Sequence, residues 1–144
     1  MIVKASADNL HQVTDLALKL WPENVPSELE EEMARLLQDR ASALFLNFQD
    51  GRAVGFAQCQ LRHDYVEGTE HSPVGYLEGI YVEPDWRRNG IAGKLLSACE
   101  SWARQQGCRE FASDCEIINS ESLRFHLGLG FTEANRIICF TKKL

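Results

Sequence analysis

Residues 82–94 read Val-Glu-Pro-Asp-Trp-Arg-Arg-Asn-Gly-Ile-Ala-Gly-Lys, and this stretch decides the fold. Before it, the apolar run from Val74 to Val82 predicts a strand that Pro84 stops; after it, apolar side chains at helical spacing predict a helix over residues 90–106. A basic, glycine-containing turn between a strand and a helix offers free backbone amides and the positive end of the helix dipole. The stretch therefore predicts an anion site. The alternative is an ordinary helix N-terminus with solvated arginines.

The rest of the chain predicts a single α/β domain over residues 1–144, within the usual length of one domain. Hydrophobic periodicity predicts the other helices at residues 6–21, 27–37 and 120–129, and strands at 1–5, 41–49, 53–61, 108–115 and 131–141. The second helix is expected to start with a capping box, Ser27-x-x-Glu30. Hairpins come first and strand–helix alternation follows, so we expect a mixed β-sheet with helices on both faces.

Composition excludes several classes of function. With 15 Lys and Arg against 21 Asp and Glu, the net charge is −6, which disfavours a general nucleic-acid binder. No apolar run approaches the ~20 residues of a membrane span, and the N-terminus does not read as a signal peptide. The five cysteines are scattered without a C-x-x-C pair, so we expect reduced thiols, no metal site and a cytoplasmic location.

Charge is unevenly distributed along the chain. Between His63 and Trp86 there is no Lys or Arg, but there are six acids: Asp64, Glu67, Glu70, Glu78, Glu83 and Asp85. Together with Asp114 at the end of the next expected strand, they predict a negative funnel for a cationic partner. Glu78 lies in a strand that otherwise reads as buried, where a lone charge is unfavourable unless it is paired or functional. We expect Glu78 and Asp114 to be the catalytic carboxylates; the alternative is that each caps a helix or pairs with an arginine.

The anion loop resembles the acetyl-CoA signature of the GNAT acetyltransferases. The loop reads Arg87-x-x-Gly90-x-Ala92 after a strand that ends in Ile80-Tyr81-Val82, and the late segment reads Phe125-His126-x-x-x-Gly130-Phe131. The resemblance implies a GNAT acyltransferase fold with acetyl-CoA as co-substrate. The contacts it implies come from Ile80, Tyr81, Val82, Arg88, Asn89, Gly90, Ile91, Ala92, Gly93 and Asn119.

Stretches outside the cofactor loop are similar to the aminoglycoside 6′-N-acetyltransferase group of this superfamily. They are Leu20-Trp21-Pro22, 62–68, 72–80, 108–114 and 129–133. The resemblance implies acetylation of aminoglycoside 6′-amino groups by direct transfer in a ternary complex, hence antibiotic resistance, and a homodimer. It places Trp21, Tyr65, Glu78 and Asp114 in the acceptor site. Asn24 and Asn135 depart from the pattern, since relatives can carry a histidine near the first position and an acid at the second.

Alternatives remain for the chemistry and for the function. His126 stands where many GNAT enzymes carry a tyrosine that protonates the leaving thiolate, so either His126 serves or the thiolate leaves toward solvent. A backbone N–H near Val82 is expected to polarise the thioester carbonyl, and Cys115 is expected to be a packed thiol, since no acyl-enzyme is needed. The alternative acceptors are a polyamine or a protein amino group; a further alternative is a non-catalytic acyl-CoA-binding module. The apolar run 137–140 fits either a dimer contact or a core strand.

Overall fold

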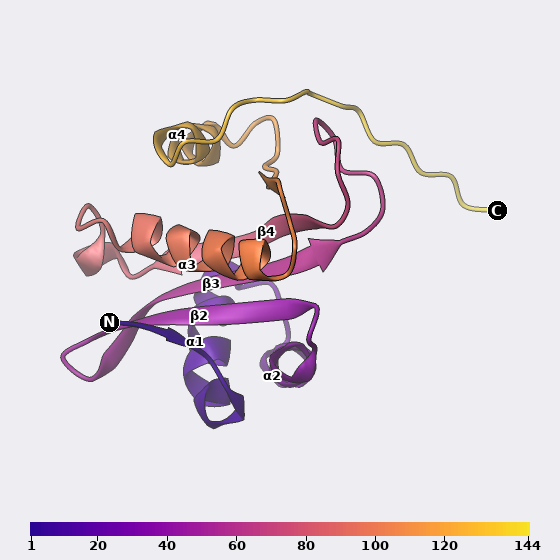
Figure 1. Ribbon diagram of the computed structural model, residues 1–144. Coiled ribbons are helices and arrows are strands. Elements are labelled where there is room, and N and C mark those ends of the chain that lie inside the picture. The colour runs from indigo at the N-terminus through magenta and orange to yellow at the C-terminus, as the bar shows by residue number, and fades with distance from the viewer.

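The computed structural model describes residues 1–144. Five strands and four helices, with two short 3-10 turns, follow one another along the chain (Figure 1). In order they are β1 (Ile2–Lys4), η1 (Ala7–Asn9), α1 (Leu10–Leu20), α2 (Pro26–Gln38), β2 (Ser42–Gln49), β3 (Arg52–Arg62), β4 (Val74–Val82), η2 (Pro84–Trp86), α3 (Ile91–Gln105), β5 (Phe111–Ala112) and α4 (Ser120–Gly128).

The strands form one mixed sheet in the order β1-β2-β3-β4-β5, antiparallel except for the parallel pair β4–β5. Helix α3 covers one face of this sheet, while α1 and α2 cover the other (Figure 1). The predicted mixed sheet with helices on both faces is confirmed.

Two apolar clusters hold the helices to the sheet. On one face Leu95 and Cys99 of α3 are fully buried against β3 and β4. On the other, Val13 of α1 and Met33 of α2 pack against Phe56 and the inner residues of β2. Each of these three helices presents one apolar stripe, as the 3.6-residue period of its sequence predicts, and burying that stripe is the main stabilising contribution.

A β-bulge interrupts the pairing of β3 with β4. Gln58 faces Gly79, but the next residue, Cys59, faces Leu77, so Glu78 is an extra residue on β4. A bulge bends a strand and re-aims a side chain. It explains how a carboxylate occurs inside an otherwise apolar strand.

The expected closing strands at 131–141 are wrong, and the expected strand 108–115 is reduced to Phe111–Ala112. A strand requires a neighbouring edge with which to exchange hydrogen bonds. After α4 the chain pairs with no strand edge, and the last residues extend away from the body (Figure 1). Apolar, β-branched composition was therefore insufficient to form a strand here.

The second helix also begins differently from expectation. It starts at Pro26 with Val25 at the N-cap, so Ser27 lies inside the first turn and forms no capping box. Proline is well suited to the first helical position because its missing N–H would have no helical partner there. No helix is both long and apolar enough to span a bilayer.

Candidate active site

The loop between β4 and α3 presents a row of unpaired backbone donors. The successive amides from Arg88 to Gly93 donate to no acceptor in the chain, and the first helical bond of α3 runs from the Lys94 amide to the Gly90 carbonyl. Unpaired amides at a helix N-terminus, reinforced by the helix dipole, bind anions. The loop therefore has the donors that a pyrophosphate requires.

Gly90 gives this loop its shape and its open face. Its φ is +75°, in the left-handed region that favours glycine, and no atom lies within 4 Å of where a Cβ would stand. Arg87 ties the loop to the end of β4: its Nε donates to the Val82 carbonyl at 2.8 Å, and its guanidinium lies 5.6 Å from the Tyr81 ring centroid. Arg88 remains exposed beside the free amides.

The strand that leads to this loop is paired on one side only for most of its length. β5 meets β4 at Gly75 and Tyr76 and then departs, whereas β3 follows β4 as far as Val82. The predicted cofactor residues Ile80, Tyr81 and Val82 therefore lie on the unpaired stretch, next to the free amides. An extended ligand can approach the backbone of β4 along this stretch.

Glu83 does not belong to the expected acidic funnel. Glu83 is 8% exposed, and its carboxylate pairs with Lys19 and lies 3.7 Å from the Arg52 guanidinium. The Tyr81 hydroxyl also reaches it, at 3.4 Å. Burial of a carboxylate requires such partners. Glu83 is thus a structural group that ties α1 and β3 to the end of β4.

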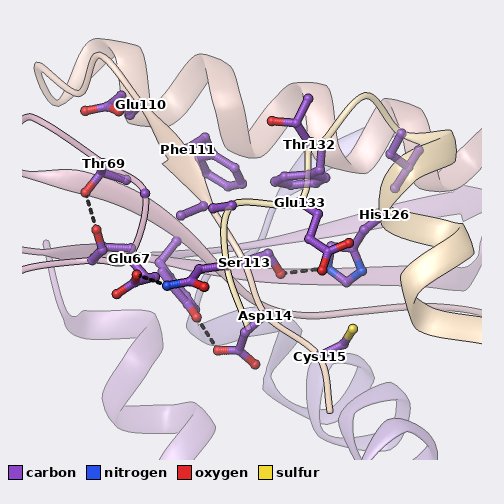
Figure 2. A pocket seen from close by; sticks show the side chains of 18 of the residues that line it. Glu67, Thr69, Glu110, Phe111, Ser113, Asp114, Cys115, His126, Thr132 and Glu133 are labelled. Atoms are coloured by element: carbon purple, nitrogen blue, oxygen red, sulfur yellow. Dashed lines mark hydrogen bonds between the residues drawn. The ribbon is translucent and has the colours of Figure 1, made fainter. Parts of the chain in front are cut away.

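A cleft of about 1060 Å³ lies between β5, loop residues 65–69, α4 and residues 131–137. It brings together three of the predicted acceptor residues, Tyr65, Asp114 and Asn135, while Trp21, Asn24 and Glu78 lie outside its lining. Figure 2 shows Glu67, Ser113 and Asp114 in the same part of the cleft lining, with His126 next to Ser113. Several carboxylates thus line one concave surface.

A chain of contacts connects Asp114 to Glu78. The Asp114 carboxylate accepts a hydrogen bond from the Tyr76 hydroxyl (Figure 2). The Arg62 guanidinium lies 3.4 Å from the centroid of the Tyr76 ring and donates from Nη2 to Glu78 at 2.9 Å. Burial, followed by the hydrogen bond to Asp114, raises the pKa of Tyr76 above its usual value, so its hydroxyl remains a donor. The two predicted catalytic carboxylates are therefore linked through Tyr76 and Arg62.

Trp21 and Asn24 lie at the end of α1, close to the bulge. The Trp21 ring meets Phe56 edge-on at 6.3 Å and packs on Gly79, where a Cβ would come within 2.5 Å of it. The Asn24 side chain donates to the Trp21 carbonyl at 3.1 Å. Trp21 thus lies beside the residue that follows Glu78, on the sheet face that α1 covers.

His126 is held by two serines. Its Nδ1 is 2.7 Å from the Ser122 carbonyl oxygen, which only accepts, so Nδ1 carries a proton. In the neutral ring, Nε2 then accepts from the Ser113 hydroxyl at 2.8 Å. If Nε2 is protonated, Ser113 can turn its proton toward the Leu77 carbonyl, 3.4 Å away. The pair can therefore hold His126 in either protonation state.

Two further groups order the walls of the cleft. Asn135, whose role was expected to concern substrate, donates to Glu67 at 2.6 Å. Glu110 anchors loop residues 63–73: its Oε1 accepts from the amides of Glu70 and His71 at 2.9 and 2.8 Å and lies 2.8 Å from His71 Nδ1. This loop carries Tyr65, so Glu110, which itself lines the cleft, holds one of its walls in place.

Sequence reasoning assigned no role to Arg62, Ser113 or Glu110. Arg62 had a usable signal, because a cation at the end of one strand of a hairpin can reach a carboxylate on a neighbouring strand. Ser113 and Glu110 had none, since both act through contacts that are far apart in sequence. Asn119 was predicted to contact acetyl-CoA. Its side-chain Oδ1 accepts a hydrogen bond from the Ser122 amide at 3.1 Å and so caps α4.

We expect Glu110→Ala to release the loop that carries Tyr65. The hydrogen bond from the Glu70 amide, followed by that from His71, lowers the pKa of Glu110 below its usual 4.5. The anchor is therefore intact above pH 4.5 and is lost as pH falls through the lower pKa of the folded protein. In ¹⁵N spectra, the amides of Glu70 and His71 should titrate below pH 4.5, and hydrogen exchange at both should accelerate in Glu110→Ala.

Glu121→Ala, an equivalent change on the first turn of α4, should leave both amides unaffected. Titration of the Glu70 amide at or above pH 4.5, or unchanged exchange in Glu110→Ala, would contradict this role of Glu110.

Comparison with known proteins agrees with this geometry. Residues 10–131 match the acetyltransferase (GNAT) family. The chain is 43% identical over 145 residues to an aminoglycoside N(6′)-acetyltransferase type 1 of Serratia marcescens, across all of this chain and 99% of that protein.

Two solved structures are similar over the full length of this chain. One is AAC(6′)-Iy in complex with the bisubstrate analog CoA-S-monomethyl-acetylneamine, at a TM-score of 0.95 and 38% identity, covering 98% of that chain. The other is aminoglycoside 6′-N-acetyltransferase AAC(6′)-IG of Acinetobacter haemolyticus in its apo form, at a TM-score of 0.95 and 40% identity, covering 99% of that chain. The chain therefore belongs to the GNAT acetyltransferase family, within the group of the type 1 aminoglycoside N(6′)-acetyltransferases.

Proposed function

We propose that this protein transfers the acetyl group of acetyl-CoA to the 6′-amino group of aminoglycosides and thereby confers resistance to them. The observation that carries the proposal is the course of β4. The unpaired stretch of β4 leads to the free amides of Arg88 to Gly93. The opposite end of the strand, at Tyr76, adjoins the cleft that holds Asp114. An anionic, extended co-substrate and a polycationic acceptor each have complementary groups there.

The acetyl-CoA site is formed by backbone more than by side chains. Amides 88–93 receive the pyrophosphate, and Arg88 adds positive charge. The extended arm of acetyl-CoA lies along Ile80–Val82, where a backbone N–H polarises the thioester carbonyl. Asn119 caps α4 with its side-chain Oδ1, so its side-chain NH₂ group remains a donor for the co-substrate.

The acceptor site is formed by carboxylates and aromatic rings. Asp114 and Glu78 orient the ammonium groups of the aminoglycoside, and one of them, directly or through water, accepts the proton that makes the nitrogen nucleophilic. Tyr65 and Trp21 provide apolar surfaces for sugar rings, and Asn135 contributes a polar side chain where relatives can carry an acid.

Transfer is direct within a ternary complex. The neutral nitrogen attacks the thioester carbon and the C–N bond forms. The nitrogen then loses its second proton to a carboxylate of the site or to water, and the C–S bond breaks with its electron pair left on sulfur. His126 is the candidate donor of a proton to the thiolate, since its Nε2 is held by Ser113, which has a second acceptor within reach. Cys115 has no part in this scheme.

Thiol release from acetyl-CoA, measured with kanamycin, spermidine and a lysine peptide as acceptors, tests the proposal. We expect turnover with kanamycin to exceed turnover with the other two. Preferential turnover of spermidine or of the peptide would favour a different cationic amine as substrate. Tight acetyl-CoA binding without turnover of any acceptor would identify a non-catalytic binding module.

Asp114→Asn should reduce kcat/KM for kanamycin roughly 100-fold, because it removes a charge that orients the acceptor and can take its proton. The dissociation constant of acetyl-CoA, measured by calorimetry, should change less than about twofold, since the free amides lie elsewhere. Asp15→Asn, an exposed position on α1, is the matched control. Unchanged kcat/KM in Asp114→Asn would exclude this role.

We further propose that the protein is a cytoplasmic homodimer. Ile138 and Phe140 are 80% and 87% exposed and belong to a segment that has no strand partner in its own chain. Ile117 and Ile118, before α4, are also exposed. Apolar surface of this kind indicates an interface, and a second copy is the partner that our proposal assigns to it.

Adding one charge to each of two apolar positions, Ile138→Asp with Phe140→Asp, should shift the dimer toward monomer in sedimentation equilibrium, because the charges would be buried at the interface. Thr141→Asp in the same segment should leave the mass unchanged. A wild-type protein that sediments as a monomer at all concentrations would exclude the dimer.

A further inference from the structure

Arg62 occupies a central position among the acceptor groups without having been assigned to them. It is the last residue of β3, and it faces Val74 across the β3–β4 hairpin. Of the pair Arg62 and Glu78, only Arg62 lines the cleft. A positive charge on the wall of a cleft for a polycation is unfavourable unless it has another task.

The contacts of Arg62 indicate that task. Oε1 of Glu78 accepts two hydrogen bonds from the guanidinium, from Nη2 at 2.9 Å and from Nε at 3.3 Å, whereas Oε2 accepts one, from Nη2 at 3.2 Å. A carboxylate oxygen accepts about two hydrogen bonds. Oε1 is therefore saturated, and Oε2 retains capacity for one more donor.

The face of the guanidinium has a second partner. It stacks at 3.4 Å on the ring of Tyr76, whose hydroxyl donates to Asp114. Planar stacking and a fork of donors are properties of arginine that lysine lacks. Arg62 thus fixes the orientation of Glu78 through its N–H groups. The plane of its guanidinium packs on Tyr76, which in turn donates a hydrogen bond to Asp114.

We infer that Arg62 is a positioning residue of the acceptor site, which fixes Glu78 so that Oε2 is the oxygen presented to the acceptor ammonium. The inference rests on the proposed function, because it gives one residue of that acceptor site its orientation. Arg62 does not itself contact the reacting atoms; it acts through Glu78 and Tyr76.

A double-mutant cycle tests this role in the full-length protein. Arg62→Met should reduce kcat/KM for kanamycin roughly 10- to 100-fold, since small misplacements of an orienting group have effects of this size. The dissociation constant of acetyl-CoA should be unchanged. In a Glu78→Gln background, Arg62→Met should have little further effect, because its target is already lost.

Two variants separate positioning from charge and from folding. Arg62→Lys keeps the charge but loses the fork and the stacking plane, so we expect most of the loss to remain. Arg52→Met removes an arginine from the other end of the same strand, where it lies near Glu83, and should leave kcat/KM unchanged. Thermal unfolding of each variant reports whether it is folded.

The outcomes separate this inference from the proposed function. If the wild type acetylates kanamycin but Arg62→Met retains full kcat/KM, or if Arg62→Met and Glu78→Gln have fully additive effects, the inference alone fails. A fully active Arg62→Lys would show that charge, and not orientation, is what matters, and would also overturn it. Absence of turnover by the wild type would overturn the proposed function and the inference with it.

Discussion

β4 pairs with β3 along its whole length, but it pairs with β5 only at Gly75 and Tyr76. This incomplete pairing is the constraint on which the rest of the site depends. It leaves Ile80–Val82 with backbone that an extended ligand can approach. It also directs the chain after β5 toward α4, so that Ser113 and Asp114 lie near His126 and the cleft.

The same strand separates two kinds of charge. At its end, the amides of residues 88–93 and Arg88 present positive charge, while the bulge at Glu78 and the neighbouring Asp114 present carboxylates. Glu78 and Glu83 differ in burial and in partners: Glu83 is buried and pairs with Lys19 and Arg52, whereas Glu78 is only partly buried and pairs with Arg62 alone. The net charge of −6 is therefore less informative than the positions of individual carboxylates.

The parts of the fold that were predictable depend on local chemistry. Pro84, Gly90 and the arginines between them act on their own stretch of backbone, so the turn and the start of α3 could be read from sequence. The register of β3 against β4 could not, because one extra residue at Glu78 changes which side chains meet. Without that register, neither the Arg62–Glu78 pair nor the burial of Glu83 is visible. The closing strands were overpredicted because β-propensity alone does not bring a segment alongside a strand edge.

Backbone amide shifts during titration with acetyl-CoA test the central claim most directly. If the unpaired stretch of β4 and the free amides after it form the co-substrate site, the largest changes should fall at residues 80–82 and 88–93, with none in β1 or α2. Changes centred instead on the cleft, at residues 65–69 and 131–137, or their absence from 88–93, would contradict it.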